Sequence, residues 1–209
     1  MPFVNCRRPL KKIIPFGDEM IEKYLIEHCS PTLASLKTAN LFSFPLESQK
    51  NAEFELMSLA AMLRPKGVEI LVIKRSGTTA LIYVYRRDML QKDLLKPGVA
   101  EFLSAYGYRD TDIQSALSRL VARLLCAGDF PHEIGIFLGY PLNDVECFIK
   151  YGGRNCKCSG CWQAYENVEE AVKIFNRYKK CRAVYKKQWL GGRSLFQLTV
   201  SARLSGSAA

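Results

Sequence analysis

The segments Val68-Glu-Ile-Leu-Val-Ile-Lys74 and Thr78-Thr-Ala-Leu-Ile-Tyr-Val-Tyr-Arg86 decide the fold class of this chain. Both are rich in β-branched and aromatic residues, which are typical of β-strands. The short connection Arg75-Ser-Gly77 predicts an antiparallel hairpin, because glycine adopts the backbone conformation that tight turns require. These two segments are the clear strands of the sequence, so we expect one hairpin or small sheet at the centre of the fold.

Helical periodicity lies on both sides of this hairpin. We expect helices over residues 18–28, 30–40, 48–63, 88–95, 98–106, 111–126 and 167–189, two short helices around Gly139-Tyr140-Pro141, and a short helix over 194–204. Ser30 should cap the second helix and Glu170 should form a capping box with Asn167, whereas Phe42-Ser-Phe44-Pro45 should be a loop. The predicted fold class is α+β, mostly helical, with one central antiparallel β-hairpin or small sheet.

Length and composition predict one folded domain. The chain has 209 residues, of which 48% are hydrophobic and 24% charged, as in ordinary globular proteins. We expect an N-terminal extension (1–17), a single domain (18–204) with a basic C-terminal helical part (150–204), and a disordered tail (205–209). No apolar run approaches the ~20 residues of a membrane span, and we see neither a secretory signal nor a transit helix. The expected location is therefore cytoplasmic.

Positive charge is concentrated in the last third of the chain. Residues 150–209 hold 12 Lys and Arg but 3 Asp and Glu, a net charge of +9 out of +10 for the whole chain. Such a segment suits a polyanion or an acidic protein partner, although a solvated helix face has the same composition. The residues expected to contact a polyanion are Lys179, Lys180, Lys186 and Lys187.

Eight cysteines are many for such a chain, and three of them lie in Cys156-Lys-Cys158-Ser-Gly-Cys161. Cytoplasmic thiols stay reduced, which leaves metal binding, redox chemistry or apolar burial as their roles. A structural zinc or a cubane iron–sulfur cluster needs four ligands, so this loop would need another, such as Cys181.

The chain has two histidines, and each lies beside a reactive residue type. His28 precedes Cys29, and His132 precedes Glu133. Imidazole beside a thiolate is suited to activating a thiol or binding a metal. The alternative is a structural role at a helix end.

Residues 130–149 have the hydrophobic spacing of a helix-turn-helix, with Gly135 facing Val145. Asp144 and Glu146 would repel DNA phosphates, so sequence-specific DNA binding is disfavoured. We expect a scaffold corner instead, in which Gly139 is left-handed and the two carboxylates complement the dipole of the second helix.

Several blocks of the chain occur together in a recognisable order. They are His28-Cys29-Ser-Pro31-Thr32-Leu33, Leu36-Lys37-Thr38-Ala39-Asn40-Leu41-Phe42, Leu81-Ile-Tyr83-Val-Tyr85-Arg86, Pro131-His132-Glu133-Ile134-Gly135, Phe137-Leu138-Gly139-Tyr140-Pro141, Asp144-Val145, Lys157-Cys158 with Gly160 and Trp162, and Tyr178-Lys-Lys180-Cys181. This set resembles an uncharacterised bacterial family, domain of unknown function 3793, over about residues 20–200. The resemblance implies no activity. A non-cysteine residue is common in that family where Cys156 and Cys161 stand, which directs attention to the other candidates: His28, Cys29, His132, Cys158 and Cys181.

The leading prediction is a thiol/imidazole site that binds zinc, an iron–sulfur cluster or haem, or that performs thiol redox chemistry. Cys158 and Cys181 would be ligands or redox partners, brought into reach because loop 151–164 folds back onto helix 167–189. His132 and His28 would converge on the same pocket, with Glu133 orienting a ligand. The alternative is a non-enzymatic module whose basic helix docks nucleic acid or an acidic protein. A third reading is a set of buried structural thiols, and the sequence assigns no reaction.

Overall fold

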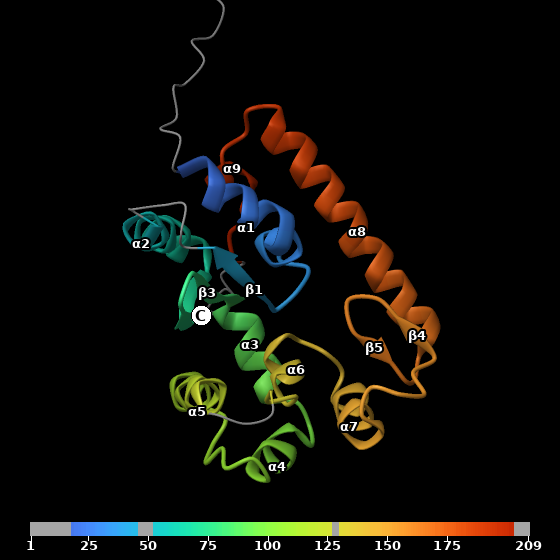
Figure 1. The fold of residues 1–209 in the computed structure, drawn as a ribbon. Coiled ribbons are helices and arrows are strands. Elements are labelled where there is room, and N and C mark those ends of the chain that lie inside the picture. The colour runs from blue at the N-terminus through green and yellow to red at the C-terminus, as the bar shows by residue number, and fades with distance from the viewer. Residues whose placement is uncertain (1–17, 46–51, 127–129, 203–209) are drawn as a thin grey trace, which may run out of the picture.

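The computed structural model describes residues 18–45, 52–126 and 130–202, which form a mostly helical α+β fold around a small sheet (Figure 1). The predicted fold class is therefore confirmed. The expected extension 1–17 and tail 205–209 lie outside the described residues. In chain order the elements are α1 (Asp18–Leu33), β1 (Ala39–Pro45), α2 (Ala52–Leu63), a 3₁₀ turn (Arg64–Lys66), β2 (Val68–Ser76), β3 (Thr79–Arg86), α3 (Arg87–Leu94), α4 (Val99–Ser104), α5 (Ile113–Leu125), α6 (Ile134–Phe137), α7 (Leu142–Tyr151), β4 (Cys158–Ser159), β5 (Gln163–Ala164), α8 (Val168–Leu190) and α9 (Leu195–Leu198).

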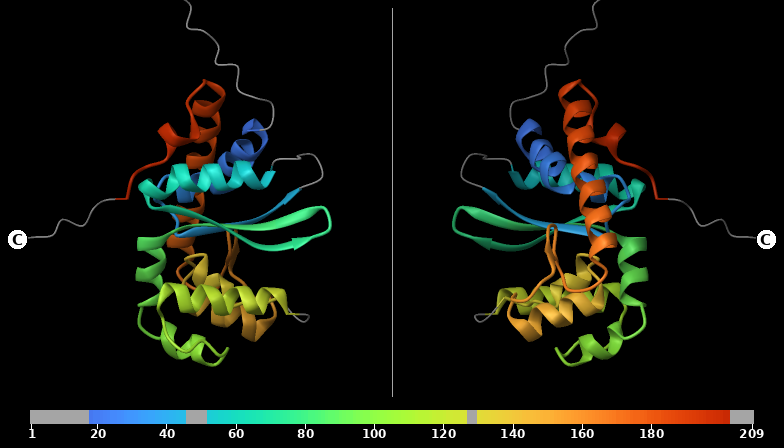
Figure 2. Two further views of the ribbon diagram at one scale, coloured as in Figure 1. Left: turned by 90° about the vertical axis from the view of Figure 1, so that its left-hand side faces the viewer. Right: turned by 90° about the vertical axis from the view of Figure 1, so that its right-hand side faces the viewer.

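The antiparallel sheet has the strand order β1-β3-β2 and lies between two helical layers (Figure 2). Side chains alternate across β3, so Ile82 and Val84 enter a core with α1, α2 and α9, whereas Tyr83 and Tyr85 enter a second core with α3 to α7. The predicted hairpin is confirmed, and its β2 strand carries an irregularity between Val72 and Lys74. Each face of the sheet is thus buried by its own group of helices.

Two sequence predictions were wrong in the region before the hairpin. Residues 18–33 form one helix, in which Pro31 is internal and Ser30 donates a hydrogen bond to the carbonyl of Ile26 instead of capping a new helix. Residues 39–45 form a strand, not a helix end and loop, because they pair with the free edge of β3. Pro45 is tolerated at the end of this edge strand, where its missing N–H is not needed.

The buried Arg86 at the end of β3 joins three distant parts of the chain. Its Nε donates to the carbonyl of Thr32 (2.6 Å), and its Nη2 donates to those of Leu33 (2.7 Å) and Val200 (2.6 Å). Its Nη1 donates to the carbonyl of Lys66 (3.2 Å). These acceptors include carbonyls at the end of α1, which the helix itself leaves unpaired.

Helix α8 packs along α1 and begins without the expected capping box. Asn167 has a φ of 48° and its side chain makes no capping hydrogen bond. Trp189 Nε1 donates to Glu22 (3.3 Å), and Tyr178 donates its hydroxyl to the carbonyl of Leu36 (3.2 Å). The end of α1 and the turn after it are thereby held against α8. In the part of the chain that the structure describes, no helix is both long and apolar enough to span a bilayer.

The corner between α6 and α7 has the predicted form. Gly139 is left-handed, with a φ of +77°, and Gly135 packs so tightly on Val145 that an added Cβ would lie 2.6 Å from Cγ2. A Cβ on Gly139 would lie 2.6 Å from Oγ1 of Thr38, which donates to the buried Asp93. The glycine therefore permits the corner to approach the turn before β1.

Candidate functional site

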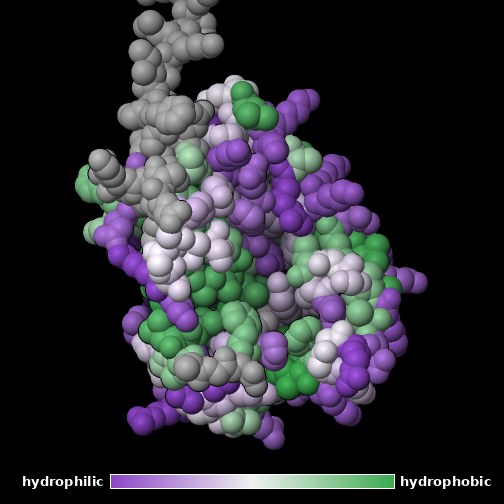
Figure 3. Space-filling view, viewed as in Figure 1, coloured by the Kyte–Doolittle hydropathy of each residue, from purple (hydrophilic) through white to green (hydrophobic). Residues whose placement is uncertain are grey.

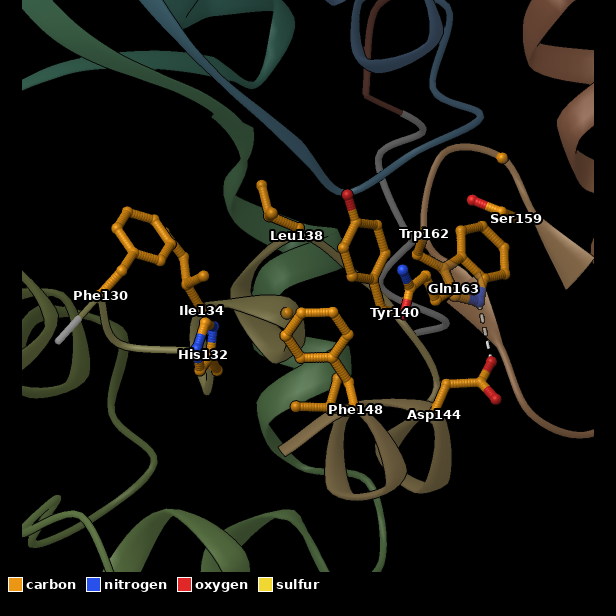
Figure 4. Close-up of a pocket in the computed structure, with 13 residues that line it drawn as sticks. Phe130, His132, Ile134, Leu138, Tyr140, Asp144, Phe148, Ser159, Trp162 and Gln163 are labelled. Carbon is orange, nitrogen blue, oxygen red and sulfur yellow. Dashed lines mark hydrogen bonds between the residues drawn. The ribbon is translucent and has the colours of Figure 1, made fainter. Parts of the chain in front are cut away.

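An aromatic cavity of about 290 Å³ opens between the α6–α7 corner and the β4–β5 loop (Figure 4). Its lining residues are Phe130, His132, Ile134, Gly135, Leu138, Tyr140, Asp144, Val145, Phe148, Ser159, Gly160, Trp162 and Gln163. Tyr140 and Trp162 are stacked with centroids 5.3 Å apart, and the His132 ring meets Phe148 edge-on at 5.1 Å. Five of the lining residues thus carry flat rings, and these come from separate segments of the chain.

Asp144 fixes the β4–β5 loop to α7, a role that sequence analysis missed. Its carboxylate is buried and accepts from Trp162 Nε1 (2.8 Å), from the backbone N–H of Tyr165 (2.8 Å) and from that of Glu166 (3.4 Å). The predicted contribution to the helix dipole is therefore secondary to these direct bonds. Since Trp162 lines the aromatic cavity, Asp144 also positions the indole ring that forms part of its wall.

The loop folds back onto α8, as predicted. Trp162 packs edge-on against Phe175 with centroids 4.6 Å apart, and Arg182 donates to Sγ of Cys161 at 3.4 Å. An added Cβ on Gly160 would lie 2.3 Å from the Phe175 ring, so no larger residue fits there. The loop therefore connects α7 with α8 on the side of the molecule that carries the cavities.

A second, polar cavity of about 130 Å³ shares Tyr140 with the first. It is lined by His28, Pro31, Lys37, Asn40, Tyr140, Cys161, Tyr178 and Arg182. The Tyr140 hydroxyl donates to the carbonyl of Cys161 (2.9 Å), which ties the corner to the loop beside this cavity. No aspartate or glutamate is among the described residues that line it.

Lys37 is the buried cation of the polar cavity, with an exposed fraction of 6%. Its Nζ lies 5.2 Å from the centre of the Tyr140 ring. Burial lowers the pKa of Lys37 to about 8, while nearby Cys161 and Cys29 act to raise it and Arg182 acts to lower it. Lysine side chains are mostly solvated, so nothing in the sequence beyond its place in a family block pointed to Lys37.

The predicted thiol and imidazole residues are distributed over several environments. His28 and Cys161 share the polar cavity, whereas His132 lines the aromatic cavity, so the two histidines do not converge on one pocket. Burial raises the pKa of Cys29, which lies in the core, and raises that of Cys181 to about 11. Cys156 and Cys158 are partly buried free thiols. Among the described residues, no group of three or more His, Cys, Asp or Glu could hold a metal ion.

Among the described residues, the Glu133 carboxylate hydrogen-bonds to Arg123 and Tyr108 and not to either histidine. It is buried, pairs with the guanidinium of Arg123, and accepts from the Tyr108 hydroxyl at 3.3 Å. The resulting ion pair connects α5 to the segment before α6. We therefore assign its carboxylate to the packing of these elements.

The basic residues of α8 are exposed, and Figure 3 shows hydrophilic surface over the upper part of this helix. Lys186 pairs with Glu27 of α1 at 3.3 Å. For Lys179, Lys180 and Lys187, no ion pair with a described acidic residue is found. One predicted contact residue is thus engaged within the fold, and three face solvent.

The fold and its cavities define a class of protein: an α+β domain with a three-stranded sheet between helical layers and two neighbouring cavities that share Tyr140. Residues 25–199 match the family described as "Protein of unknown function (DUF3793)". The chain therefore belongs to this family, as its sequence blocks indicated. Searches of curated proteins and of solved structures gave no match.

Proposed function

We propose that this protein binds a small, flat, largely apolar molecule in the aromatic cavity. The observation that carries the proposal is the wall of rings formed by Tyr140, Trp162, Phe148 and His132. Ligand cavities are mostly apolar and range from about 300 to 1,000 Å³. At about 290 Å³ the aromatic cavity lies just below this range, so it suits a small ligand of one ring or two fused rings.

The polar groups of the cavity narrow the ligand class further. Ser159, Gln163 and His132 supply hydrogen-bonding side chains, whereas Asp144 is already engaged by the loop. Aromatic rings attract one another in stacked or edge-on arrangements, and both occur in the walls. The proposed ligand is therefore an uncharged aromatic compound with one or two groups that hydrogen-bond.

Titration with indole or benzimidazole is expected to move the imidazole NMR signal of His132 and to leave that of His28 in place. The chain has just two histidines, and they line different cavities, so each signal reports on one cavity. A flat ligand beside the His132 ring shifts its signal through ring currents. The measurement is a proton–carbon correlation spectrum, with cyclohexanol as a non-planar compound of similar size.

Two single variants assign the signals and test the site. His132→Ala should weaken binding of the aromatic compound about tenfold, because it removes one ring of the wall. His28→Ala should leave the affinity unchanged, and both side chains are exposed, so neither change should unfold the protein. Equal weakening by both variants, or equal shifts with cyclohexanol, would contradict the proposal.

A thiol function in a bacterial cytoplasm is the second candidate. It is supported by the contact of Arg182 with Cys161, since nearby cations favour the reactive thiolate. His28 lines the same cavity, and the seven described cysteines are free thiols. Metal analysis of protein purified without oxygen tests whether the predicted cysteines and histidines bind zinc, an iron–sulfur cluster or haem.

A polyanion-binding role of α8 is expected to depend strongly on salt. Heparin or duplex DNA should bind weakly, and binding should fall steeply between roughly 50 and 300 mM salt because counterions are released. Charge reversal of Lys179, Lys180 and Lys187 should abolish binding without unfolding, since these side chains are exposed. Reversal of three exposed lysines elsewhere, Lys23, Lys74 and Lys92, is the matched control. Salt-independent binding would refute this role.

A further inference from the structure

Lys37 is a buried cation that the fold itself does not neutralise. Its side chain lies in the turn between α1 and β1 with an exposed fraction of 6%, and no ion pair with a described acidic residue is found. Removing an ammonium group from water is costly unless it is paired and hydrogen-bonded. The contact with the Tyr140 ring at 5.2 Å offsets only part of that cost.

A second cation enters the same cavity from α8. Arg182 is exposed, and its Nη2 donates to Sγ of Cys161 at 3.4 Å. Sulfur is a weak acceptor, so this contact satisfies little of the guanidinium. Arg182 and Lys37 line the same cavity, and burial together with the charge of Arg182 lowers the pKa of Lys37. Two cations therefore share one cavity from which described carboxylates are missing.

We infer that the polar cavity binds a small oxyanion, a carboxylate or phosphate group, between the ammonium of Lys37 and the guanidinium of Arg182. Such a group would neutralise both cations, and the guanidinium presents paired donors that match its oxygens. The side-chain amide of Asn40 lines the same cavity and can donate as well. The anion site is separate from the aromatic cavity and goes beyond the function proposed above.

The size of the cavity limits the ligand. Its volume of about 130 Å³ equals that of roughly four water molecules at ~30 Å³ each. This is room for one free anion or for the anionic end of a larger molecule. A polyanion such as nucleic acid has no place in it, so the site is distinct from the exposed lysines of α8.

Inorganic phosphate and acetate are the probes, and isothermal titration calorimetry measures their binding. Wild-type protein should bind at least one of them saturably and with a matching rise in melting temperature. Lys37→Met should lower that affinity at least tenfold, and Arg182→Gln should lower it severalfold. Lys173→Gln, which removes an exposed charge of α8 outside the cavity, should change nothing.

The stability of Lys37→Met separates a binding lysine from a structural one. Methionine has a similar length and no charge, so the variant should melt at the same or a higher temperature than the wild type. A lower melting temperature would make Lys37 a structural residue and overturn the proposal. The proposal would also be overturned if Lys37→Met kept the anion affinity of the wild type, or if the wild type bound neither anion saturably below about 10 mM.

Dependence on pH provides an independent readout. With a pKa of about 8, Lys37 is charged below that pH and neutral above it. Acetate stays ionised, so its binding to the wild type should weaken from about pH 7 to about pH 9.5, and by more than the residual binding of Lys37→Met over the same range. The groups that face Lys37 are His28 and Cys29 of α1, Tyr140 of the corner, Cys161 of the loop, and Tyr178 and Arg182 of α8. A wild-type profile that matches that of Lys37→Met would overturn the proposal.

The anion site and the aromatic-ligand site can be tested independently of each other. Phosphate should shift the NMR signal of His28, which lines the polar cavity, and should leave the His132 signal in place. A shift of the His132 signal alone would place the anion in the aromatic cavity and overturn the anion site. The response of His132 to indole tests the aromatic cavity separately.

Discussion

Replacing Arg86 with methionine is expected to lower the free energy of unfolding by about 4 kcal/mol or more. The change removes four charged hydrogen bonds, to the carbonyls of Thr32, Leu33, Lys66 and Val200. Three of these carbonyls keep a backbone donor, but Val200 has no other donor among the described residues. Hydrogen bonds to charged groups contribute roughly 1.5–3 kcal/mol each, and the effects do not add fully.

Urea unfolding followed by circular dichroism measures this effect. Arg64→Met is the matched control, because Arg64 has a side chain that is 72% exposed and bonds to Glu69 at 3.3 Å. Exposed ion pairs contribute about 0–1 kcal/mol, so the control should unfold close to the wild type. If Arg86→Met loses no more stability than Arg64→Met, the connection of α1, β3 and the C-terminal segment through Arg86 is not important for folding.

Asp144→Ala is expected to lower the free energy of unfolding by about 3 kcal/mol and to release the loop over residues 158–166. The variant loses the acceptor of the Trp162 indole and of the backbone N–H of Tyr165 and Glu166. The N–H of Tyr165 is buried and would be left without its partner. Because Trp162 then loses its position, binding of flat ligands in the aromatic cavity should also be lost.

Hydrogen exchange of the loop amides is the direct measurement. The amides of Tyr165 and Glu166 should exchange much faster in Asp144→Ala, whereas those of the sheet should change less. Glu146→Ala removes an exposed carboxylate from the same helix and serves as the control. Unchanged protection of the loop would show that Phe175 and the Tyr140 hydroxyl suffice to hold it.

Local sequence determined the elements that depend on local chemistry. The hairpin of β2 and β3 follows from two β-branched segments around a glycine turn, and α5 follows from its apolar stripe. Gly139 was recognised as the left-handed end of a helix because glycine adopts that conformation without steric cost. These features depend on neighbours within a few residues, which the sequence displays directly.

The missed elements depend on partners that are distant in sequence. Asn40 and Ser43 interrupt the apolar pattern of β1, which becomes a strand because the free edge of β3 supplies its hydrogen bonds. Pro31 suggested a new helix, but α1 continues through it. Trp162 was known as a family position, and only the carboxylate of Asp144 revealed where its ring is held.

For the candidate sites, too, some features follow from the sequence and others only from the tertiary structure. Sequence alone determined which residue types were available, including eight cysteines, two histidines and an excess of lysine in the last third of the chain. It could not tell that Cys29 would be buried in the core, that His28 and His132 would line different cavities, or that Lys37 would be enclosed. Tertiary structure decided these points because burial and the distance between charges arise only when α1, the α6–α7 corner, the β4–β5 loop and α8 pack together.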